Sequence, residues 1–242
     1  MSNRFPHQKV SLIGYTQPVA DSGLDMNLQE MVAYCARVSN PSNQGNHGTS
    51  QPLVKYLIKH MHWSPLEMVS ATIELQTTRD IARQILRHRS FSFQEFSQRY
   101  ADPTKELDFV TREARLQDPK NRQNSIPIDA GSGDLAREAA DEWEARQQEV
   151  IRLVRENYEW ATSRGIAKEQ ARSILPEGCT ISRLYMAGTL RSFVHFIQVR
   201  TASGTQAECT DVAHKIALAL APIFPMIAGF DAVQTAGNQQ VT

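Results

Sequence analysis

The residues best suited to chemistry in this sequence form a run of arginines between positions 83 and 99. Within the segment 87–100 the only carboxylate is Glu95. Like charges held close together cost free energy unless an anion or water lies among them. The planar guanidinium group makes paired hydrogen bonds to a phosphate or to the imide and carbonyl edge of a base. The pattern indicates an anion site, although a solvated basic helix face would explain the first two arginines alone. The arginines of this run are Arg83, Arg87, Arg89 and Arg99.

Three phenylalanines, Phe91, Phe93 and Phe96, are interleaved with these arginines. Bare phosphate has no need of aromatic neighbours, whereas a planar ring can pack against them. We therefore expect the anion to be a nucleotide. We also expect the stretch SFSFQEFSQ to fold as a turn that returns Arg99 to the neighbourhood of Arg89.

The same segment resembles the signature of the flavin-dependent thymidylate synthases. That signature is R-H-R, then seven residues and a serine, with E-x-S-x-R-Y at its end, and here 87–100 reads RHRSFSFQEFSQRY. Further segments resemble family blocks and follow the family's order. They are ARVS (36–39), KHMHWSPLE (59–67), ARSILP (171–176), LRSFVHFIQVR (190–200) and Q-x-E (206–208).

The resemblance implies reductive methylation of deoxyuridine monophosphate (dUMP) to thymidine monophosphate (dTMP). It implies 5,10-methylenetetrahydrofolate as carbon donor, FAD as hydride carrier and NADPH as reductant, since the redox chemistry belongs to the cofactor. The sequence has no Rossmann G-x-G-x-x-G motif, so FAD must be held in another way. The family's solution is a homotetramer with active sites at subunit interfaces.

The resemblance also implies roles for individual residues. Arg200 matches the position thought to favour ionisation at uracil N3, a role that suits a permanent cation, and it is the expected catalytic residue. The expected dUMP-binding residues are Gln84, Arg87, Glu95, Phe96, Ser97, Gln98, Arg99, Arg172 and Arg200. The expected FAD-binding residues are Ser39, His62, Ser64, Arg87, His88, Arg89, Glu95, Thr189, Arg191 and His195.

This chain departs from the common family pattern at a few positions, which bear on individual flavin contacts. Asparagine is commoner in the family at the positions of Gln94, Thr189 and His195. Histidine is commoner at the position of Gly204. The loop KNRQNS (120–125) resembles a mobile active-site loop, with Arg122 as a candidate contact, although half of its residues are ordinary loop formers.

Two further features have simple explanations. The H-x-H at 60–62, even with His88, has no carboxylate or thiolate beside it, so we do not expect a metal site. Ser97 would need an adjacent base to act as a nucleophile. The nearest candidate, Glu95, is two residues away in a loop, so we expect Ser97 to position the substrate.

The whole chain is consistent with one soluble domain, 1–242, with a polar excursion at about 101–137. It has 242 residues with 26 basic and 26 acidic side chains, so the formal charge is zero and the arginine cluster is a local feature. Neither nucleic acid nor an anionic membrane is an expected partner. The start lacks the apolar core of a signal peptide, and the apolar run at 216–230 is too short to span a bilayer. We expect a cytoplasmic protein.

The cysteines Cys35, Cys179 and Cys209 are odd in number, far apart and outside any C-x-x-C pair. They suit thiols in a reducing compartment better than disulfides or a zinc site. One rival function is a thymidylate synthase that attacks uracil with a cysteine, but none of the three has an evident base beside it. A second rival is a nucleic-acid-binding module, which would need a second basic stripe. A flavin enzyme would be yellow when purified, and neither rival would.

Apolar periodicity predicts an α+β fold with a central mixed or antiparallel sheet flanked by helices. Expected strands cover 10–15, 70–77 and 180–189, and expected helices cover 28–38, 53–61, 79–88, 138–165, 166–176, 190–200 and 205–224. Thr78 is the expected cap of the helix at 79–88. Thr205 with Glu208 forms a capping-box pattern, which explains Glu208 without any chemistry. The segment 101–137 has little periodicity, which is typical of a lid, a binding loop or disorder.

Overall fold

The protein is built around an antiparallel sheet. The computed structural model describes residues 4–230, and within them a 4-stranded sheet has the order β1 (Lys9–Tyr15), β2 (Ser70–Thr78), β6 (Ile181–Thr189) and β3 (Ser92–Glu95). Each neighbouring pair is antiparallel. The expected α+β fold with an antiparallel sheet is confirmed, and β3 is an edge strand beyond the three that periodicity predicts.

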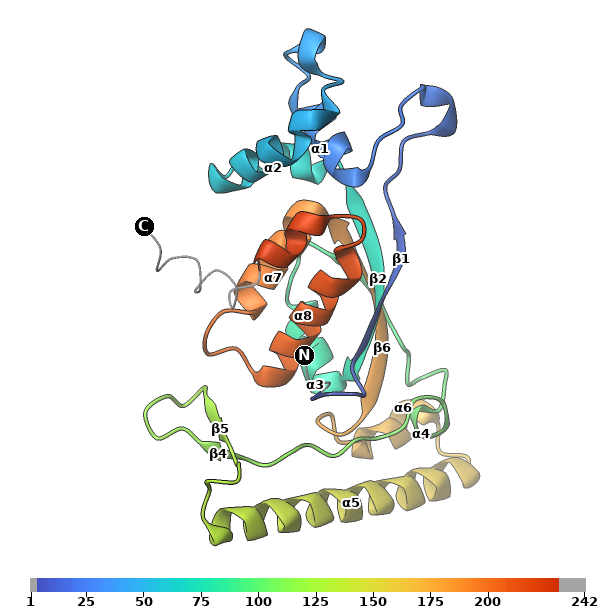
Figure 1. Ribbon diagram of the computed structural model, residues 1–242. Helices are drawn as coiled ribbons and strands as arrows, with labels where there is room; N and C mark the ends of the chain where they lie inside the picture. Colours follow the sequence, from blue (N-terminus) through green and yellow to red (C-terminus); the bar gives the residue numbers. More distant parts are fainter. Residues whose placement is uncertain (1–3, 231–242) are drawn as a thin grey trace.

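Helices cover one face of this sheet (Figure 1). α7 (Leu190–Arg200) and α8 (Ala207–Leu220) lie against it, and α3 (Arg79–Leu86) follows β2 directly. Ile73 on β2 lies opposite Met186 on β6, and both are fully buried under these helices. Because side chains alternate along a strand, the residues between them point to the other face. The strand-and-helix body therefore forms one large hydrophobic core.

Two helices, α1 (Leu28–Ala36) and α2 (Ser50–Lys59), pack against each other at the end of the sheet that is uppermost in Figure 1. The side chain of Asn27 accepts a hydrogen bond from the Glu30 backbone, and the Glu30 carboxylate accepts one from the Asn27 backbone. This capping box satisfies amide groups that a helix start leaves unpaired. Both helices are confirmed, with ends shifted by a few residues from the sequence expectation.

The long helix α5 (Asp134–Ser163) crosses beneath the other end of the sheet in Figure 1 and contacts the short α6 (Lys168–Ala171). This pair has a separate small hydrophobic cluster. Its buried members are Phe109, Val154, Tyr158, Ala161, Ala171 and Leu175. The helix expected at 166–176 is one α-helical turn followed by a 3-10 turn, Arg172–Ile174.

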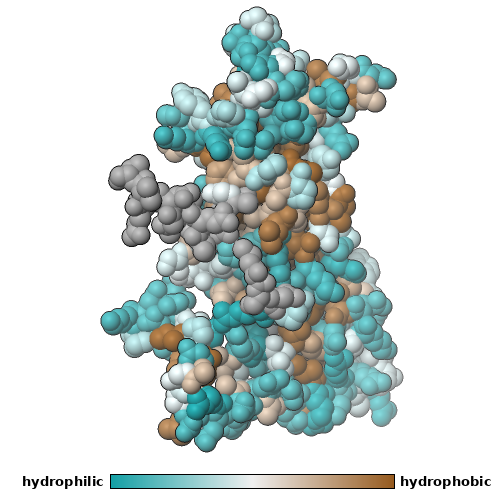
Figure 2. Space-filling view, in the orientation of Figure 1, coloured by the Kyte–Doolittle hydropathy of each residue, from teal (hydrophilic) through white to brown (hydrophobic). Residues whose placement is uncertain are grey.

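The polar segment 101–137 is more ordered than its composition indicates. It contains α4 (Pro103–Glu106) and a hairpin formed by β4 (Arg115–Gln117) and β5 (Ser125–Pro127), and α5 begins within it. Each hairpin strand has 3 residues, too few to produce a recognisable period. Figure 2 shows the hairpin projecting from the body of the molecule, with a hydrophilic outer end.

The segment 90–98 is not the simple turn that we expected, because its middle pairs with β6 as strand β3. The Phe91 ring packs edge-on against Phe193, with 4.9 Å between ring centroids, and Phe93 packs against the same core. A Cβ atom at Gly188 would lie 2.4 Å from the Phe91 ring, so this position needs glycine. Both phenylalanines pack against the core, where they contribute through the burial of apolar surface.

Short 3-10 helices join these elements. They lie at Ala20–Ser22, Pro41–Asn43, His47–Thr49, Ser64–Glu67, Arg172–Ile174 and Pro225–Phe230. Among residues 4–230, no helix combines the length and the apolar character needed to cross a lipid bilayer.

Candidate functional site

The carboxyl end of α7 brings three predicted site residues together. Arg200 donates from Nε to Nε2 of His88 at 2.8 Å, and from Nη2 to the backbone carbonyl of Gln84 at 2.7 Å. Gln84 lies in the last turn of α3 and His88 just beyond its end. The His88 ring also packs edge-on against Phe196, with 4.7 Å between centroids. The end of α3 and the end of α7 therefore bring Gln84, His88 and Arg200 together as one polar group, which lies against the core.

His88 is neutral in this arrangement. Burial, followed by the nearby charges of Arg200, His195 and Arg87, lowers the pKa of His88 to about 4. Because Nε2 of the neutral ring accepts the bond from Arg200, the ring proton lies on Nδ1. Both acceptors of Arg200 are uncharged, and within residues 4–230 no carboxylate forms an ion pair with it. Its positive charge remains available to a bound anion.

At the amino end of α7, Glu67 holds two of the predicted flavin residues. Thr189, the N-cap of α7, donates to Oε2 of Glu67 at 2.8 Å, and Nη1 of Arg191 donates to Oε1 at 2.8 Å. Burial alone would raise the pKa of Glu67, but these hydrogen bonds outweigh it and the pKa is lowered. Glu67 was not among the residues predicted from the sequence, although it ends the KHMHWSPLE block.

The predicted flavin residues His62 and Ser64 lie at this same end of the molecule. Ser64 shares the 3-10 turn Ser64–Glu67 with the carboxylate just described. The His62 ring lies edge-on to Tyr56 at 6.0 Å, and Tyr56 also contacts His60 at 4.2 Å between ring centroids. In the part of the chain that the structure describes, no cluster of histidine, cysteine and carboxylate side chains is arranged to hold a metal ion. The three rings instead form an aromatic surface.

Helix α7 connects the two groups. Arg191 and Arg200 are separated by about 14 Å along the helix axis. His195 lies one turn after Arg191, on the same exposed stripe, and its charge acts on His88. Ser39, by contrast, is exposed in the loop after α1, and no hydrogen bond or ion pair within residues 4–230 joins it to either group.

The turn that follows β3 contains most of the remaining predicted substrate residues. Glu95 accepts a 2.7 Å hydrogen bond from Ser182 on β6 and lies 3.4 Å from the Arg79 guanidinium. The Ser97 hydroxyl accepts a 3.4 Å hydrogen bond from the backbone N–H of Arg99. Glu95 is therefore bound to other groups, and Ser97 stabilises a turn. Within residues 4–230 no base forms a hydrogen bond with the Ser97 hydroxyl, so the geometry does not activate Ser97 as a nucleophile. That Ser97 positions the substrate stays a prediction.

A cleft of about 480 Å³ lies beside this turn. Its polar lining consists of Arg79, Arg83, Gln98, Glu169, Arg172, Ser173 and Glu177. Arg83 forms an ion pair with Glu177, and Arg99 lies 3.5 Å from Glu169. Arg172 forms no ion pair with a described residue, so it is the cation here whose charge is free to meet a phosphate.

Three further predicted residues follow α3 and β3 in the chain. Arg87 and Arg89 flank His88, are exposed, and form no ion pair within residues 4–230. Phe96 is half-buried, and its backbone N–H donates to the carbonyl of Arg183 at 2.8 Å, which extends the pairing of β3. The two arginines therefore remain candidates for anion binding.

Two helix starts differ from the sequence expectation. The capping box expected at the start of α8 does not form, because Gln206 is the N-cap and Glu208 accepts hydrogen bonds of 2.5 and 2.7 Å from Arg115. Glu208 is buried, and a buried carboxylate gains more from a charged partner than from a backbone amide. Thr78 does precede α3, but its hydroxyl donates to the Asp80 carboxylate at 2.7 Å and caps no backbone amide.

The thiols are poorly suited to nucleophilic attack. Burial raises the pKa of Cys209 to about 11, and it also raises the pKa of Cys35 and of Cys179. A thiolate is the reactive form, so a raised pKa lowers reactivity at neutral pH. This disfavours the rival in which cysteine attacks uracil.

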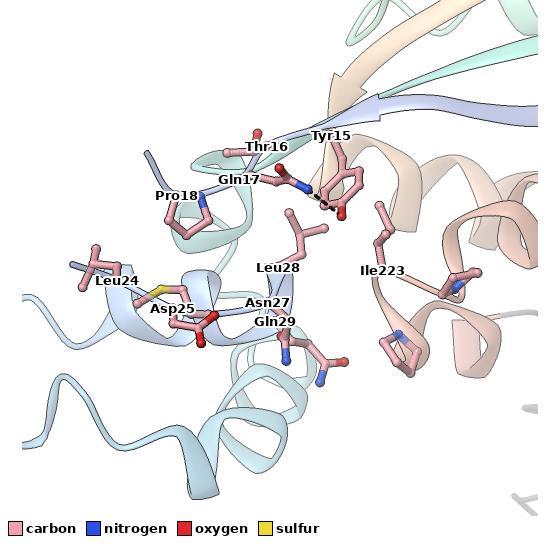
Figure 3. A pocket seen from close by; sticks show the side chains of 13 residues that line it. Tyr15, Thr16, Gln17, Pro18, Leu24, Asp25, Asn27, Leu28, Gln29 and Ile223 are labelled. Atoms are coloured by element: carbon pink, nitrogen blue, oxygen red, sulfur yellow. Dashed lines mark hydrogen bonds between the residues drawn. The ribbon is translucent and has the colours of Figure 1, made fainter. Parts of the chain in front are cut away.

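A separate cavity of about 420 Å³ lies between the end of β1, the start of α1 and residues 222–225 (Figure 3). Within it, Gln17 donates a 2.7 Å hydrogen bond to the Tyr15 hydroxyl. Its lining includes none of the predicted site residues. We therefore assign it no part in the reaction.

Comparison with known proteins identifies the family. The family described as "Thymidylate synthase complementing protein" matches residues 24–226. The chain is 46% identical over 218 residues to a probable flavin-dependent thymidylate synthase of Paramecium bursaria Chlorella virus 1, covering 90% of this chain and 95% of that protein. It is 42% identical over 221 residues to the flavin-dependent thymidylate synthase of Synechocystis sp., covering 90% and 97%.

Among solved structures, the fold is similar to that of the UMP/dUMP methylase PolB from Streptomyces cacaoi bound with 5-Br dUMP. The TM-score is 0.71 and the identity 25%, over 92% of this chain and 93% of PolB. The sequence matches span nearly the whole of both relatives, and the structural match spans the same body. The chain therefore belongs to the flavin-dependent thymidylate synthase family, and its redox cofactor is a flavin.

Proposed function

We propose that this chain converts dUMP to dTMP with 5,10-methylenetetrahydrofolate as carbon donor and NADPH as the reductant of a bound FAD. Family membership supports the reaction. The observation that carries the residue assignment is Arg200, whose guanidinium is fixed by Gln84 and by a neutral His88 while its charge stays uncompensated. We place the reaction in the cytoplasm, where reducing conditions keep the free cysteines as thiols.

In this proposal Arg200 lies against the uracil ring of dUMP. A cation that is fixed before the reaction stabilises negative charge developing on the ring without reorganising, and such contacts account for about 3–4 kcal/mol in other enzymes. His88 keeps the guanidinium oriented without neutralising it. Arg172 and Arg99 lie on the cleft side of the β3 turn and bind the phosphate and sugar, together with Arg87.

Residues from several segments around α7 fit a flavin. Arg87 and Arg89, which lack carboxylate partners within residues 4–230, supply positive charge for a pyrophosphate. The Tyr56 and His62 rings supply a surface for a planar group, and Glu67 orients Arg191 beside it. When bound, the flavin supplies the hydride for reduction. The chain's own side chains bind and orient it and limit the access of water.

We further propose that the active enzyme is a homotetramer. The predicted residues lie in two groups along the surface of α7, and Arg172 faces a third region, so a partner subunit is needed to enclose a ligand that touches all of them. An apolar groove of about 410 Å³ between α5 and the turn after α6 supports self-association. It contains Trp160, 57% exposed, and Ile174, 42% exposed, and apolar patches of this kind mark interfaces.

The direct test is an activity assay on the purified protein, which should be yellow. We expect dTMP from dUMP, methylenetetrahydrofolate and NADPH, and none when any one of the three is omitted. A parallel reaction with UMP tests whether the substrate range of PolB extends to this chain. Absence of dTMP from FAD-loaded protein with all three substrates would overturn the proposal. Light scattering gives the mass of the assembly, and Trp160→Glu should reduce it.

A further inference from the structure

The first turn of α8 contains a buried charge pair with no role in the reaction as described so far. Glu208 is 1% exposed, and both of its carboxylate oxygens accept hydrogen bonds from Nη2 of Arg115, at 2.5 and 2.7 Å. Burial alone would raise the pKa of Glu208, but the Arg115 hydrogen bonds outweigh it and the pKa is lowered. Both groups are therefore charged at neutral pH. The pair joins residues 93 positions apart.

Arg115 begins strand β4, so this pair anchors the β4–β5 hairpin to the body of the protein. The hairpin tip, residues 118–124, is organised internally. The Asp118 carboxylate accepts hydrogen bonds from the backbone of Lys120 and Asn121 and from the Asn124 side chain. Burial of the Asp118 carboxylate is negligible, and these hydrogen bonds lower its pKa. A tip held in this way moves with its strand as one unit.

A second anchor lies three residues earlier. The backbone N–H of Arg112 donates to Gln147 on α5 at 2.9 Å, and the Gln147 side chain donates back to the Arg112 carbonyl at 2.9 Å. The Arg112 guanidinium binds the Asp80 carboxylate at the start of α3. Arg112 therefore fixes where the hairpin leaves the body, and the Arg115–Glu208 pair fixes the direction in which it points.

The hairpin tip and the start of α8 form the walls of one cleft of about 500 Å³. Its polar lining includes Arg112, Arg115, Arg122, Asn124 and Gln206. Gln206 accepts a 2.8 Å hydrogen bond from the side chain of Gln84, whose backbone carbonyl binds Arg200. One hydrogen bond thus separates the wall of this cleft from the proposed substrate group.

The charges in this cleft are unequal. Arg112 and Arg115 are each compensated by a carboxylate, Asp80 and Glu208. Arg122 is exposed and forms no ion pair with a described residue. The two compensated arginines act as structural anchors, and Arg122 supplies the free positive charge of the cleft.

We propose that Arg115 and Glu208 are a positioning pair that holds the 118–124 loop beside Gln206 and Gln84, so that Arg122 faces the anionic nucleotide. The inference rests on the proposed function, because it takes Gln84 and Arg200 as substrate residues. Neither member of the pair touches the substrate. Their effect passes through the hairpin, so weakening the pair raises the KM for dUMP more than it lowers kcat.

The test uses the FAD-loaded enzyme and tryptic cleavage after Lys120 and Arg122, quantified by mass spectrometry. Arg115→Met should speed cleavage at these two sites at least tenfold. Arg115→Lys, which keeps the charge but loses the second contact, should lie between Arg115→Met and the natural protein. Arg152→Met on α5 is the matched control, because Arg152 pairs with exposed glutamates and not with a buried one. Its cleavage rate should equal that of the natural protein.

The kinetic arm measures KM for dUMP and kcat separately. We expect about a tenfold rise in KM for Arg115→Met and for Arg122→Gln, with faster cleavage at Lys120 only in the former. An unchanged cleavage rate in both Arg115 variants would show that the pair does not hold the loop. Faster cleavage with unchanged kinetics would show that the loop is not part of the site. Failure of the proposed function appears differently, as absence of dTMP from the natural protein whatever its cleavage pattern.

Discussion

The two ends of α7 carry the same side chain in opposite electrostatic settings. Arg191 at the amino end shares Glu67 with Thr189, so its charge is matched within the chain. Arg200 at the carboxyl end is held as firmly, but by a backbone carbonyl and a neutral imidazole. A carboxylate partner fixes an arginine and cancels most of its field, whereas neutral acceptors fix it and leave the field intact.

This contrast suggests how to tell arginines whose charge is free to meet an anion from those whose charge is matched within the protein. Arg112 and Arg115, like Arg191, have carboxylate partners. Arg172, like Arg200, has none among the described residues. An anionic ligand binds best where the protein has fixed a cation without neutralising it. The predictions below test this distinction, in order of decreasing effect.

Replacing Arg200 should have the largest effect. Arg200→Ala removes the uncompensated cation, and we expect kcat to fall by about 100- to 1,000-fold, the range seen when one stabilising donor is lost. Arg200→Lys keeps the charge without the planar fork and should retain part of the activity. Flavin content, measured by absorbance, should be unchanged in both. Near-normal turnover of Arg200→Ala would show that the uncompensated arginine has been given the wrong role.

Binding of dUMP should stabilise the fold, because the cations that its phosphate meets include Arg87 and Arg172, which have no carboxylate partner among the described residues. At a concentration ~100 times its dissociation constant, dUMP adds about 2.7 kcal/mol to the free energy of unfolding. This raises the melting temperature by roughly 5–10 °C for a chain of this size. Deoxyuridine, which lacks the phosphate, should raise it far less. Differential scanning fluorimetry measures both shifts.

Two variants test whether the rise in melting temperature caused by dUMP depends on an arginine without a carboxylate partner. Arg172→Gln should remove most of the dUMP shift, whereas Arg83→Gln, in which the lost arginine was already paired with Glu177, should leave it nearly intact. Equal losses in both variants would mean that carboxylate pairing does not distinguish the two classes of arginine.

The neutral state of His88 predicts a pH dependence of stability. Its pKa is about 4 in the folded protein and 6.5 for a free histidine, so the folded state resists the proton that the unfolded state takes up. This contribution is complete above pH 6.5 and declines as the pH falls towards 4. Because His88 is only half-buried, we expect an effect on the order of 1 kcal/mol. Urea midpoints between pH 7 and pH 4.5 should fall less in His88→Gln than in the natural protein; parallel curves would contradict this assignment.

The smallest effect should come from the thiols. Changing Cys35, Cys179 and Cys209 together to alanine or serine should leave substantial turnover, because burial holds their pKa above the ordinary range. The measurement is dTMP formation by a folded, flavin-loaded triple variant. Loss of turnover in such a variant would assign the chemistry to a cysteine and make the contrast between the arginines secondary.

Much of the body could be predicted from local sequence patterns. The alternation in SATIELQT predicts β2, and the buried pairs with β6 confirm that its apolar residues share one face. The helical spacing in LRSFVHFIQVR predicts α7, which begins and ends at the expected residues. These patterns predict the elements correctly because buried side chains recur along the sequence with the period of the helix or of the strand. The 3-residue strands of the hairpin have no period to read.

The site was less predictable, because its polar contacts join distant segments. Glu67 is 122 residues from Thr189, and Glu208 is 93 residues from Arg115. Neither pairing leaves a local signal, and a helix-cap explanation for Glu208 satisfied the local pattern while missing its partner. The grouping of Arg200 with His88 and Gln84 was implied only by resemblance to a family. Their assigned roles stay predictions until the variants are measured.

The order of strands in the sheet has a consequence for how the chain is made. β2 and β6 are central neighbours, and Thr78 pairs with Ile181, so on the order of a hundred residues must be synthesised between the two partners. Such nonlocal pairing slows folding, because the chain loses entropy in closing a long loop before the strand contacts that stabilise the loop have formed. At ~5–20 residues per second on the ribosome, one edge of β2 stays unpaired for roughly 5–20 s. We expect nascent chains to need protection from aggregation during that interval.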